Sequence, residues 1–310
     1  EGDRSAWRFP PFEATRQGDR LYGLGTADMK GSLANGMAVL KVLHDARSRP
    51  PGTLMFQAVM GEEMDEDGTR TLLRLGYTGD YAIVMEPTDV RIGPGTRGAC
   101  WHRITLTGPA AHCGLTDPRT QDTMMFLARF GAALEAYHAR VAAQQHHLLA
   151  SPACRMTQVR GGETHNSTAG RCELVVDRRM LPHESYAQVT EELARILEEI
   201  KVAIPGVEHA IEFIAGNEAT ETSLHSPLVG AVQRNFREVL GREAEIWGPP
   251  YGSDMRNFVV DAGIPTINFG PGDFHVCHQP DEFVPVPDLL ACAKVVMGTA
   301  VDLLSQDRDS

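Results

Sequence analysis

The sequence lacks several features that would assign a chain to a class at once. Its 310 residues contain no CxxC pair, and no apolar run approaches the roughly 20 residues that a membrane span needs. Basic residues are in deficit, 29 against 41 acidic residues, which gives a net charge of −12. A general nucleic-acid binder would need a basic footprint. We therefore expect neither a membrane nor a nucleic acid as a partner.

The cysteines are widely scattered along the chain. The six lie at positions 100, 113, 154, 172, 277 and 292. This pattern is typical of reduced thiols in the cytoplasm rather than of a disulfide framework. No basic region followed by an apolar stretch opens the chain, so no secretory signal is visible. We expect a cytoplasmic protein.

The first hundred residues alternate helical and strand patterns. Apolar residues at helical spacing predict a helix over 29–46, and a shorter helix is expected over 69–75. Continuous apolar runs at 53–60 and 81–85 predict buried strands. Such strands, separated by helices, indicate a mostly parallel sheet with both faces covered.

The middle of the chain follows a different order. Strands are expected over 101–107, 156–160, 172–179 and 208–213, and helices over 122–145 and 184–200. The resulting order β-α-β-β-α-β is that of ferredoxin-like α+β domains. We expect residues 97–214 to form such a domain, inserted into the first one.

The last hundred residues return to the α/β pattern. Helices are expected over 226–240 and 287–304, with a short apolar strand over 265–269 between them. The predicted fold class is therefore α/β. Residues 1–96 and 215–310 would form a domain with a mixed, mostly parallel sheet, and the inserted domain would be separate.

Acidic and imidazole groups follow several of the expected strands and glycine turns. Asp28 lies in the segment GLGTADMKG, Glu62 and Glu63 follow the strand that ends at Met60, Glu86 follows YAIVM, and His278 lies beyond the last strand. Because ligands of open α/β sheets bind at the carboxyl ends of the strands, these groups are expected to converge. Carboxylates that converge repel one another unless a cation lies between them, and carboxylate with imidazole suits Zn²⁺ and related ions.

Each of these residues has an ordinary structural alternative. Asp28 alone is a good N-cap for the helix over 29–46. The acidic run over 62–67 alone is more often a solvated loop, and a single histidine such as His278 more often lies on the surface or packs. Only their joint position at strand ends favours a site.

Six motifs carry a resemblance to a known family. They are GLGTADMKG, VMGEE, MEPT, GPAAHCG, GSDMR and GPGDFHVCHQPDE. In this order they resemble the dinuclear zinc amidohydrolases and metallopeptidases, the family of acetylornithine deacetylase, succinyl-diaminopimelate desuccinylase, aminoacylase and glutamate carboxypeptidase. The resemblance covers essentially the whole chain.

The resemblance implies a role for each converging residue. Asp28 matches the carboxylate that bridges two metal ions, and Glu63 and Glu86 match ligands of one ion each. His278 matches the ligand that shares an ion with Glu63, and Glu62 matches the general base. A complete member of the family binds two Zn²⁺ per subunit, and cobalt or manganese accepts the same ligands.

The resemblance extends to the inserted domain, which matches a lid and dimerisation domain. His112 matches a catalytic histidine that reaches the site of the partner subunit. Arg179 and Asn166 match groups that hold the substrate, and Gly252 and Ser253 match a loop that lines the substrate pocket. The alternative for Arg179 is a plain ion pair at a strand end, and for His112 a turn residue. The implied partners are a second copy of the chain and an N-acyl amino acid or short peptide.

The sequence departs from the family at one point. The family places a His-x-Asp motif upstream of the segment that begins here at Trp7, and none of residues 1–6 is a histidine. We therefore expect an N-terminally truncated form that lacks on the order of 80–100 residues. Such a chain would bind about one tight zinc, through Asp28, Glu63 and His278.

These observations predict a metal-dependent hydrolase of linear amides. The favoured reaction is N-acyl amino acid deacylation, as in acetylornithine deacetylase or the desuccinylase, and a metallo-exopeptidase is the related possibility. The alternative is a catalytically silent truncated homologue that only dimerises and binds metal. A metal-binding regulator without turnover is a third interpretation.

Overall fold

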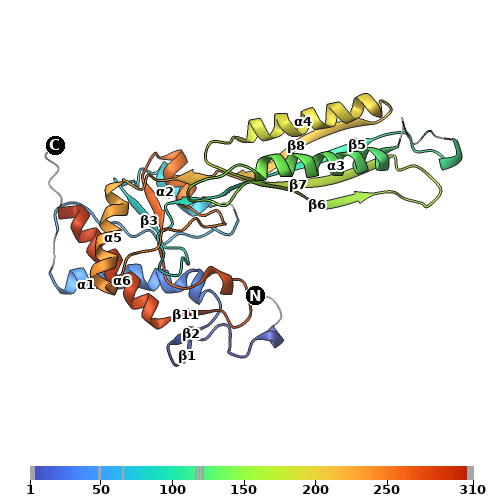
Figure 1. Ribbon diagram of the computed structural model, residues 1–310. Helices are drawn as coiled ribbons and strands as arrows, with labels where there is room; N and C mark the ends of the chain where they lie inside the picture. Colours follow the sequence, from blue (N-terminus) through green and yellow to red (C-terminus); the bar gives the residue numbers. More distant parts are fainter. Residues whose placement is uncertain are drawn as a thin grey trace. The chain divides into compact units, whose positions relative to one another are not determined.

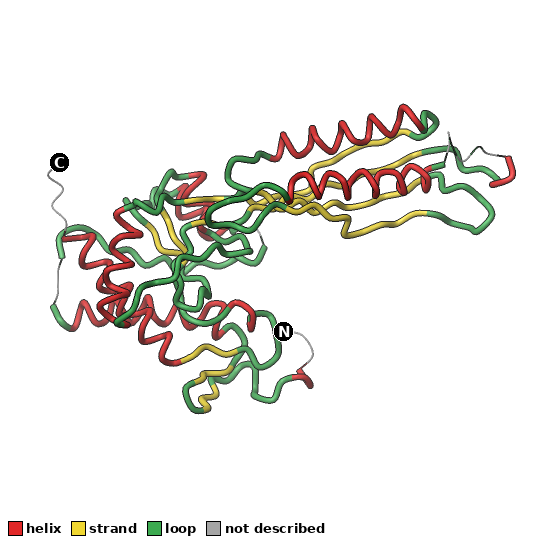
Figure 2. Tube along the Cα trace, viewed as in Figure 1, coloured by secondary structure: helices red, strands yellow, loops and turns green. Residues whose placement is uncertain are grey.

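The computed structural model describes residues 4–47, 50–64, 66–115, 117, 119 and 122–305. The chain divides into two compact units, which are described separately here. Unit 1 comprises Glu1–Thr96, Glu221–Pro249 and Ser253–Ser310, and unit 2 comprises Arg97–Thr220 and Pro250–Gly252. Figure 2 shows that the long strands belong to unit 2, whereas the strands of unit 1 are short.

Unit 2 is built on one four-stranded antiparallel sheet. Its elements are β5 (Gly98–Thr107), the short turn η3 (Cys113–Leu115), α3 (Thr123–Ala142), β6 (Ala153–Gly161), β7 (Arg171–Met180), α4 (Tyr186–Ala203) and β8 (Glu208–Asn217). The sheet order is β6-β7-β5-β8, with antiparallel pairing throughout. In sequence order this is the second, third, first and fourth strand, which is the arrangement of a ferredoxin-like domain and confirms that part of the expected fold class.

One face of this sheet carries the core of unit 2. Side chains that alternate along β5 and β7, such as Ile104 and Leu174, point toward the helices and are fully buried. Phe126 of α3 and Leu193 of α4 complete the same apolar cluster, so both helices cover this face (Figure 1). The start of α4 is fixed by a capping box with Ser185 as N-cap.

Unit 1 contains several short strands and the remaining helices. Its elements are η1 (Arg4–Ala6), β1 (Thr15–Gln17), β2 (Arg20–Tyr22), η2 (Thr26–Lys30), α1 (Gly31–Asp45), α2 (Asp67–Arg74), β3 (Ala82–Val84), β4 (Gly95–Thr96), α5 (Pro227–Leu240), η4 (Asn257–Asp261), β10 (Thr266–Asn268), η5 (Phe274–Val276), β11 (Phe283–Pro285) and α6 (Val286–Ser305). Strand β9 (Thr220–Glu221) lies where the chain passes between the units. In the described part of the chain, no helix combines the length and the apolar character that a membrane crossing needs.

The strands of unit 1 form a mixed set of small sheets. β3 and β10 pair in parallel, and β1, β2 and β11 form an antiparallel sheet in that order. Ile267 and Phe269 near β10 are fully buried against Phe236 of α5 and Val295 of α6. Because β3 and β10 run in parallel, the segments that follow them leave from the same edge of the sheet.

The predicted strand over residues 53–60 is wrong. Among the residues that the structure describes, no strand pairs with this segment, and Met60 is 84 % exposed. An apolar run becomes a strand only where a neighbour supplies backbone partners. What holds the segment instead is the Gln57 side chain, which donates to the carbonyl oxygen of Tyr77, and the ring of Phe56, which packs over Gly36 of α1.

Candidate metal centre

Asp28 lies in a glycine-containing loop before α1. Gly25 adopts φ +79°, a left-handed conformation that favours glycine, and the loop then turns through η2. Asp28 itself is not helical (φ −122°, ψ 89°), and the N-cap of α1 is Lys30. The N-cap alternative for Asp28 therefore does not apply. Burial raises the pKa of Asp28, and the charge of Glu63 raises it further.

Glu62 and Glu63 occupy the middle of a tight turn. Gly61 has φ +91°, and its carbonyl oxygen accepts from the N–H groups of Met64 at 3.2 Å and Glu66 at 2.8 Å. The turn presents both glutamates on the same short loop. Burial raises the pKa of Glu62 to about 8, with the charges of Asp254 and Glu63 acting in the same direction. Asp65, two positions after Glu63, lies outside the described residues.

Glu86 follows β3 and is the most deeply buried of the predicted ligands. It is 5 % exposed, and its Oε1 atom has no hydrogen-bond partner among the described residues. Burial raises its pKa well above the ordinary value, and the charges of Glu62 and Asp28 add to this effect. A buried carboxylate oxygen without a partner is costly, so this atom points to a group that the protein alone does not supply.

His278 connects two of the carboxylates. Its Nε2 atom lies 2.9 Å from Oε1 of Glu63 and 3.2 Å from Oδ2 of Asp28. The ligand atoms of the three residues all lie within 4.8 Å of one another. Burial acts against the charged imidazole, but the hydrogen bond with Glu63 and the charges of both carboxylates outweigh it, so the pKa of His278 is raised.

This set of side chains fits a divalent cation. The strongest charges acting on Glu62 and Glu86 all come from other carboxylates, a repulsion that a cation would relieve. Oxygen and imidazole donors are those that zinc, cobalt and manganese accept in proteins. The structure thus brings Asp28, Glu63 and His278 together, and places Glu62 and Glu86 within electrostatic reach of them.

The predicted residues of unit 2 lie at two places in that unit. His112 is exposed, and it pairs with Ser167 in a β-bridge beside Asn166. Arg179 lies on β7 and forms two hydrogen bonds with Asp177, at 2.9 and 3.0 Å. The ion-pair alternative for Arg179 thus describes a contact that is present. The roles of His112, Asn166 and Arg179 toward a substrate stay predictions.

The predicted pocket loop contains one buried residue. Ser253 is fully buried, and its hydroxyl donates to Oδ1 of Asn268 at 2.9 Å. Gly252 belongs to unit 2, where a Cβ atom would meet the side chain of Asn217 at 2.9 Å. The hydrogen bond of Ser253 and the close approach at Gly252 each explain why that residue type occurs there. The role of both residues toward a substrate also stays a prediction.

Two buried acids near the site were given no role by the sequence reasoning. Asp254 accepts hydrogen bonds from Thr69 at 2.7 Å and from Asn257 at 3.2 Å, and it raises the pKa of Glu62. Glu282 is 2 % exposed and accepts from the backbone of the Asp28 loop. Both lie inside motifs that carry the resemblance, GSDMR and GPGDFHVCHQPDE. Their position in these motifs was the feature of the sequence that could have pointed to a role at the site.

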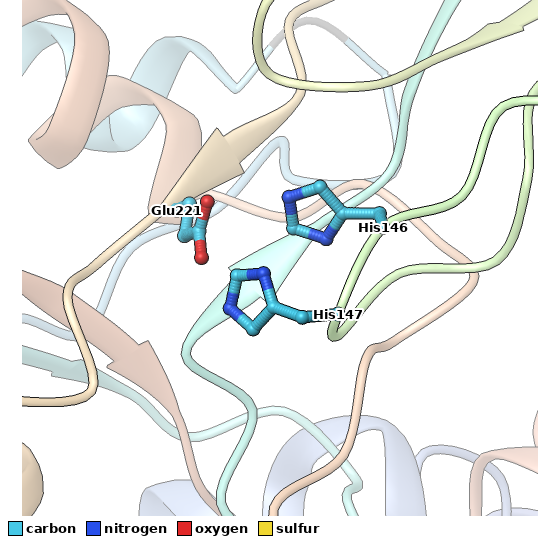
Figure 3. Close-up of side chains that lie close together, drawn as sticks. All are labelled: His146, His147 and Glu221. Atoms are coloured by element: carbon cyan, nitrogen blue, oxygen red, sulfur yellow. The ribbon is translucent and has the colours of Figure 1, made fainter.

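A pair of histidines in unit 2 looks like a second set of ligands. The rings of His146 and His147 lie with their centroids 4.5 Å apart (Figure 3). Nδ1 of His146 accepts from the N–H groups of Leu148 and Leu149, at 3.2 and 3.1 Å. This nitrogen is committed to the turn that follows α3, which indicates a structural role for His146.

Comparison with known proteins identifies a matching family and curated relatives. The family described as Peptidase family M20/M25/M40 matches residues 1–302. The acetylornithine deacetylase of Vibrio campbellii is 29 % identical, over 94 % of this chain and 77 % of its own length. The N-formyl-4-amino-5-aminomethyl-2-methylpyrimidine deformylase of Halalkalibacterium halodurans is 28 % identical, over 94 % and 73 %.

Solved structures show the same fold at low sequence identity. A tripeptidase from Staphylococcus aureus superposes with a TM-score of 0.76 and 18 % identity, over 94 % of this chain and 76 % of that one. The aminopeptidase PepT from Bacillus cereus gives 0.75 and 20 %, over the same shares. The chain belongs to peptidase family M20/M25/M40 and is a metal-dependent hydrolase of amide bonds.

Proposed function

We propose that this chain removes the acyl group from an N-acyl amino acid at the centre formed by Asp28, Glu63, Glu86 and His278. The observation that carries the proposal is the position of His278, whose Nε2 lies within 3.2 Å of both Asp28 and Glu63 although some 215 residues or more separate them in sequence. The acetylornithine deacetylase relatives support this substrate class. A metallo-exopeptidase is the second candidate, because the structural relatives include a tripeptidase and an aminopeptidase.

Zinc is the proposed metal, with cobalt and manganese as possible substitutes. Asp28 would bridge two ions, Glu63 and His278 would complete the first, and Glu86 would hold the second. Oε1 of Glu86, which has no hydrogen-bond partner among the described residues, supports this assignment. Among the described residues the first ion has three proposed ligands and the second has two, so we expect the first ion to be held more tightly.

The chain's own groups can carry the proton transfers. A divalent cation, when bound, makes a water molecule more acidic and withdraws charge from a substrate carbonyl. Glu62 would take the proton from that water and pass it to the departing amine. In the metal-free chain, burial and the charge of Asp254 raise the pKa of Glu62 to about 8, so this side chain can hold a proton near neutral pH.

Unit 2 has its proposed part in substrate binding and assembly. His112 would act on the developing oxyanion in the site of a second copy, within a homodimer formed through residues 97–214. Arg179 and Asn166 would hold the substrate, with Gly252 and Ser253 lining its pocket. We place the protein in the cytoplasm, and the six free thiols support a reducing compartment.

A substrate screen tests the proposed reaction. The metal-free chain is reconstituted with Zn²⁺, Co²⁺ or Mn²⁺ and incubated with N-acetyl and N-succinyl amino acids, and with unacylated dipeptides of the same composition. We expect release of free amine from an N-acyl amino acid, and loss of the activity when a chelator is added. Cleavage of the dipeptides alone would favour the exopeptidase. No hydrolysis with any of the three ions would contradict both.

The competing proposal is a catalytically silent module that binds metal and dimerises. It is supported by the segment over 53–60, which has no strand partner among the described residues and exposes Met60 and Met55. A site next to an unsupported segment is less rigidly held. The same screen separates the two proposals, because a silent module retains the metal and releases no amine.

A further inference from the structure

Glu282 lies beside the candidate metal centre without being one of its expected ligands. It precedes β11, four residues after His278, and it is 2 % exposed. Its side chain accepts three backbone hydrogen bonds. Oε2 accepts from the N–H of Gly25 at 2.7 Å, and Oε1 accepts from those of Ala27 at 2.9 Å and Asp28 at 3.0 Å.

The backbone of Glu282 holds the same loop. Its carbonyl oxygen accepts from the N–H of Gly23 at 3.0 Å and from the hydroxyl of Thr26 at 3.3 Å. One residue thus makes five contacts with the loop that carries Asp28. Because His278 lies four positions before it, Glu282 connects the two segments that supply these two ligands.

A carboxylate is a costly choice for this task. Burial is the main cause of the raised pKa of Asp28, and the charge of Glu282 adds to it, after that of Glu63. A neutral amide would add no negative charge to a set of acids, but its NH₂ group could not accept from an N–H group as the second carboxylate oxygen does. A carboxylate instead makes stronger hydrogen bonds to N–H groups, and its charge becomes favourable once a cation is present.

We propose that Glu282 is a positioning residue, which holds the Asp28 loop and the His278 segment in the arrangement that binds a divalent cation. This inference rests on the proposed function, because it assumes that Asp28 and His278 are ligands. Outer partners that fix metal ligands commonly change metal affinity about ten- to hundred-fold when they are replaced.

Cobalt titration followed by visible absorption tests the role of Glu282. We expect Glu282→Gln to bind Co²⁺ about ten- to hundred-fold more weakly than the wild-type chain, with a changed intensity of the absorption band. The intensity reports the geometry of the ligands. A weaker affinity with an unchanged band would mean that only the charge of Glu282 matters, and it would overturn the positioning role.

A matched control separates positioning from general stability. Thr222 is buried in unit 1, where its hydroxyl donates to the carbonyl oxygen of Thr266 at 2.6 Å and accepts from the Thr266 N–H at 2.9 Å. Thr222→Val removes these bonds and should lower the melting temperature without changing the Co²⁺ affinity or band. If both variants lose affinity in proportion to their stability, Glu282 is merely structural.

Two further measurements keep the proposal testable: Co²⁺ binding by Glu282→Asp and by the wild-type chain. If Glu282→Gln does not fold, Glu282→Asp retains the charge but shortens the reach, and we expect it to show the altered band as well. Identical binding by the wild type and by Glu282→Asp would overturn the inference. If the wild-type chain itself binds no Co²⁺, the proposed function fails first, and that result is distinguishable because it precedes any comparison of variants.

Discussion

Two buried charged side chains, one in each unit, show how differently the units use charge. Arg178 of β7 is fully buried in unit 2, and Glu86 is 5 % exposed in unit 1. Arg178 donates to the hydroxyl of Tyr137 at 3.0 Å, to Glu184 and to the carbonyl oxygen of Arg179. Oε1 of Glu86, in contrast, has no hydrogen-bond partner within the described part of the chain.

The environments of the two groups have opposite effects on their charges. Burial acts against the charge of Arg178, but Tyr137 and Glu184 outweigh it and raise its pKa, so the guanidinium stays charged. Burial and the charge of Glu62 both raise the pKa of Glu86, which favours its neutral form. A buried charge with partners belongs to the scaffold of unit 2, whereas a buried carboxylate among carboxylates marks a place for a cation.

The largest expected effect is a loss of turnover at the candidate metal centre in unit 1, without a loss of metal. Glu62→Gln should lower turnover by about 10²- to 10⁴-fold, the usual contribution of a general base, with the metal content near normal. Steady-state kinetics and elemental analysis measure the two quantities. Asp45→Asn is the matched control, because Asp45 is an exposed acid that pairs only with Lys41 in the contacts observed. Loss of metal from Glu62→Gln would instead place Glu62 among the ligands.

The next effect falls on the stability of unit 2. Arg178→Ala should lower the free energy of unfolding by about 3–5 kcal/mol, because Glu184 then stays in the interior without its cation. Chemical denaturation measures this change. Arg103→Ala, which removes an exposed ion pair with Glu212 on the same sheet, should cost no more than about 1 kcal/mol. If Arg178→Ala lost metal but kept its stability, the division between scaffold and site would be wrong.

The smallest effect is a graded dependence of stability on pH in the metal-free protein. Glu62 has a folded-state pKa of about 8, above its unfolded value, so the folded state binds more protons between the two values. Stability therefore falls as the pH rises from about 4.5 toward 8. The raised pKa of His278 acts in the same direction, because its contribution is complete below the unfolded pKa and is lost as the pH rises.

Melting curves across this pH range, with and without Zn²⁺, provide the measurement. Bound metal should flatten or reverse the slope, because it stabilises the ionised carboxylates of Glu86 and Asp28. A metal-free protein whose stability rises over the same range would show that these carboxylates are not held in a repelling set.

The regular elements were predictable where packing repeats along them. Alternating apolar residues such as Ile104 and Leu106 predicted β5, and helical spacing predicted α1, α3, α4, α5 and α6 to within a few residues. The strand predicted over 53–60 does not form. Strand formation depends on a pairing partner, and the apolar pattern of one segment does not reveal whether that partner is present. The short strands β1, β2 and β11 were not predicted, because a run of three residues is too short to show a periodic pattern.

The sequence predicted that the ligand residues converge, but it did not predict the residues that hold them in place. Asp28, Glu63 and His278 were expected to meet because of where they lie relative to strands and of the family resemblance, and the structure brings them together. Glu282 and Asp254 act through hydrogen bonds to residues more than 180 positions away in the sequence. No local sequence pattern predicts such a contact, because the contact depends on the packing of loops that are distant in the sequence.

Zinc content after dialysis tests the central claim most directly, in the wild-type chain beside His278→Ala. The account predicts about one tightly held ion per wild-type chain and its loss in the variant, because Nε2 of His278 closes the set that Asp28 and Glu63 begin. Retention of the ion by His278→Ala, or a wild-type chain that holds none, would contradict the account.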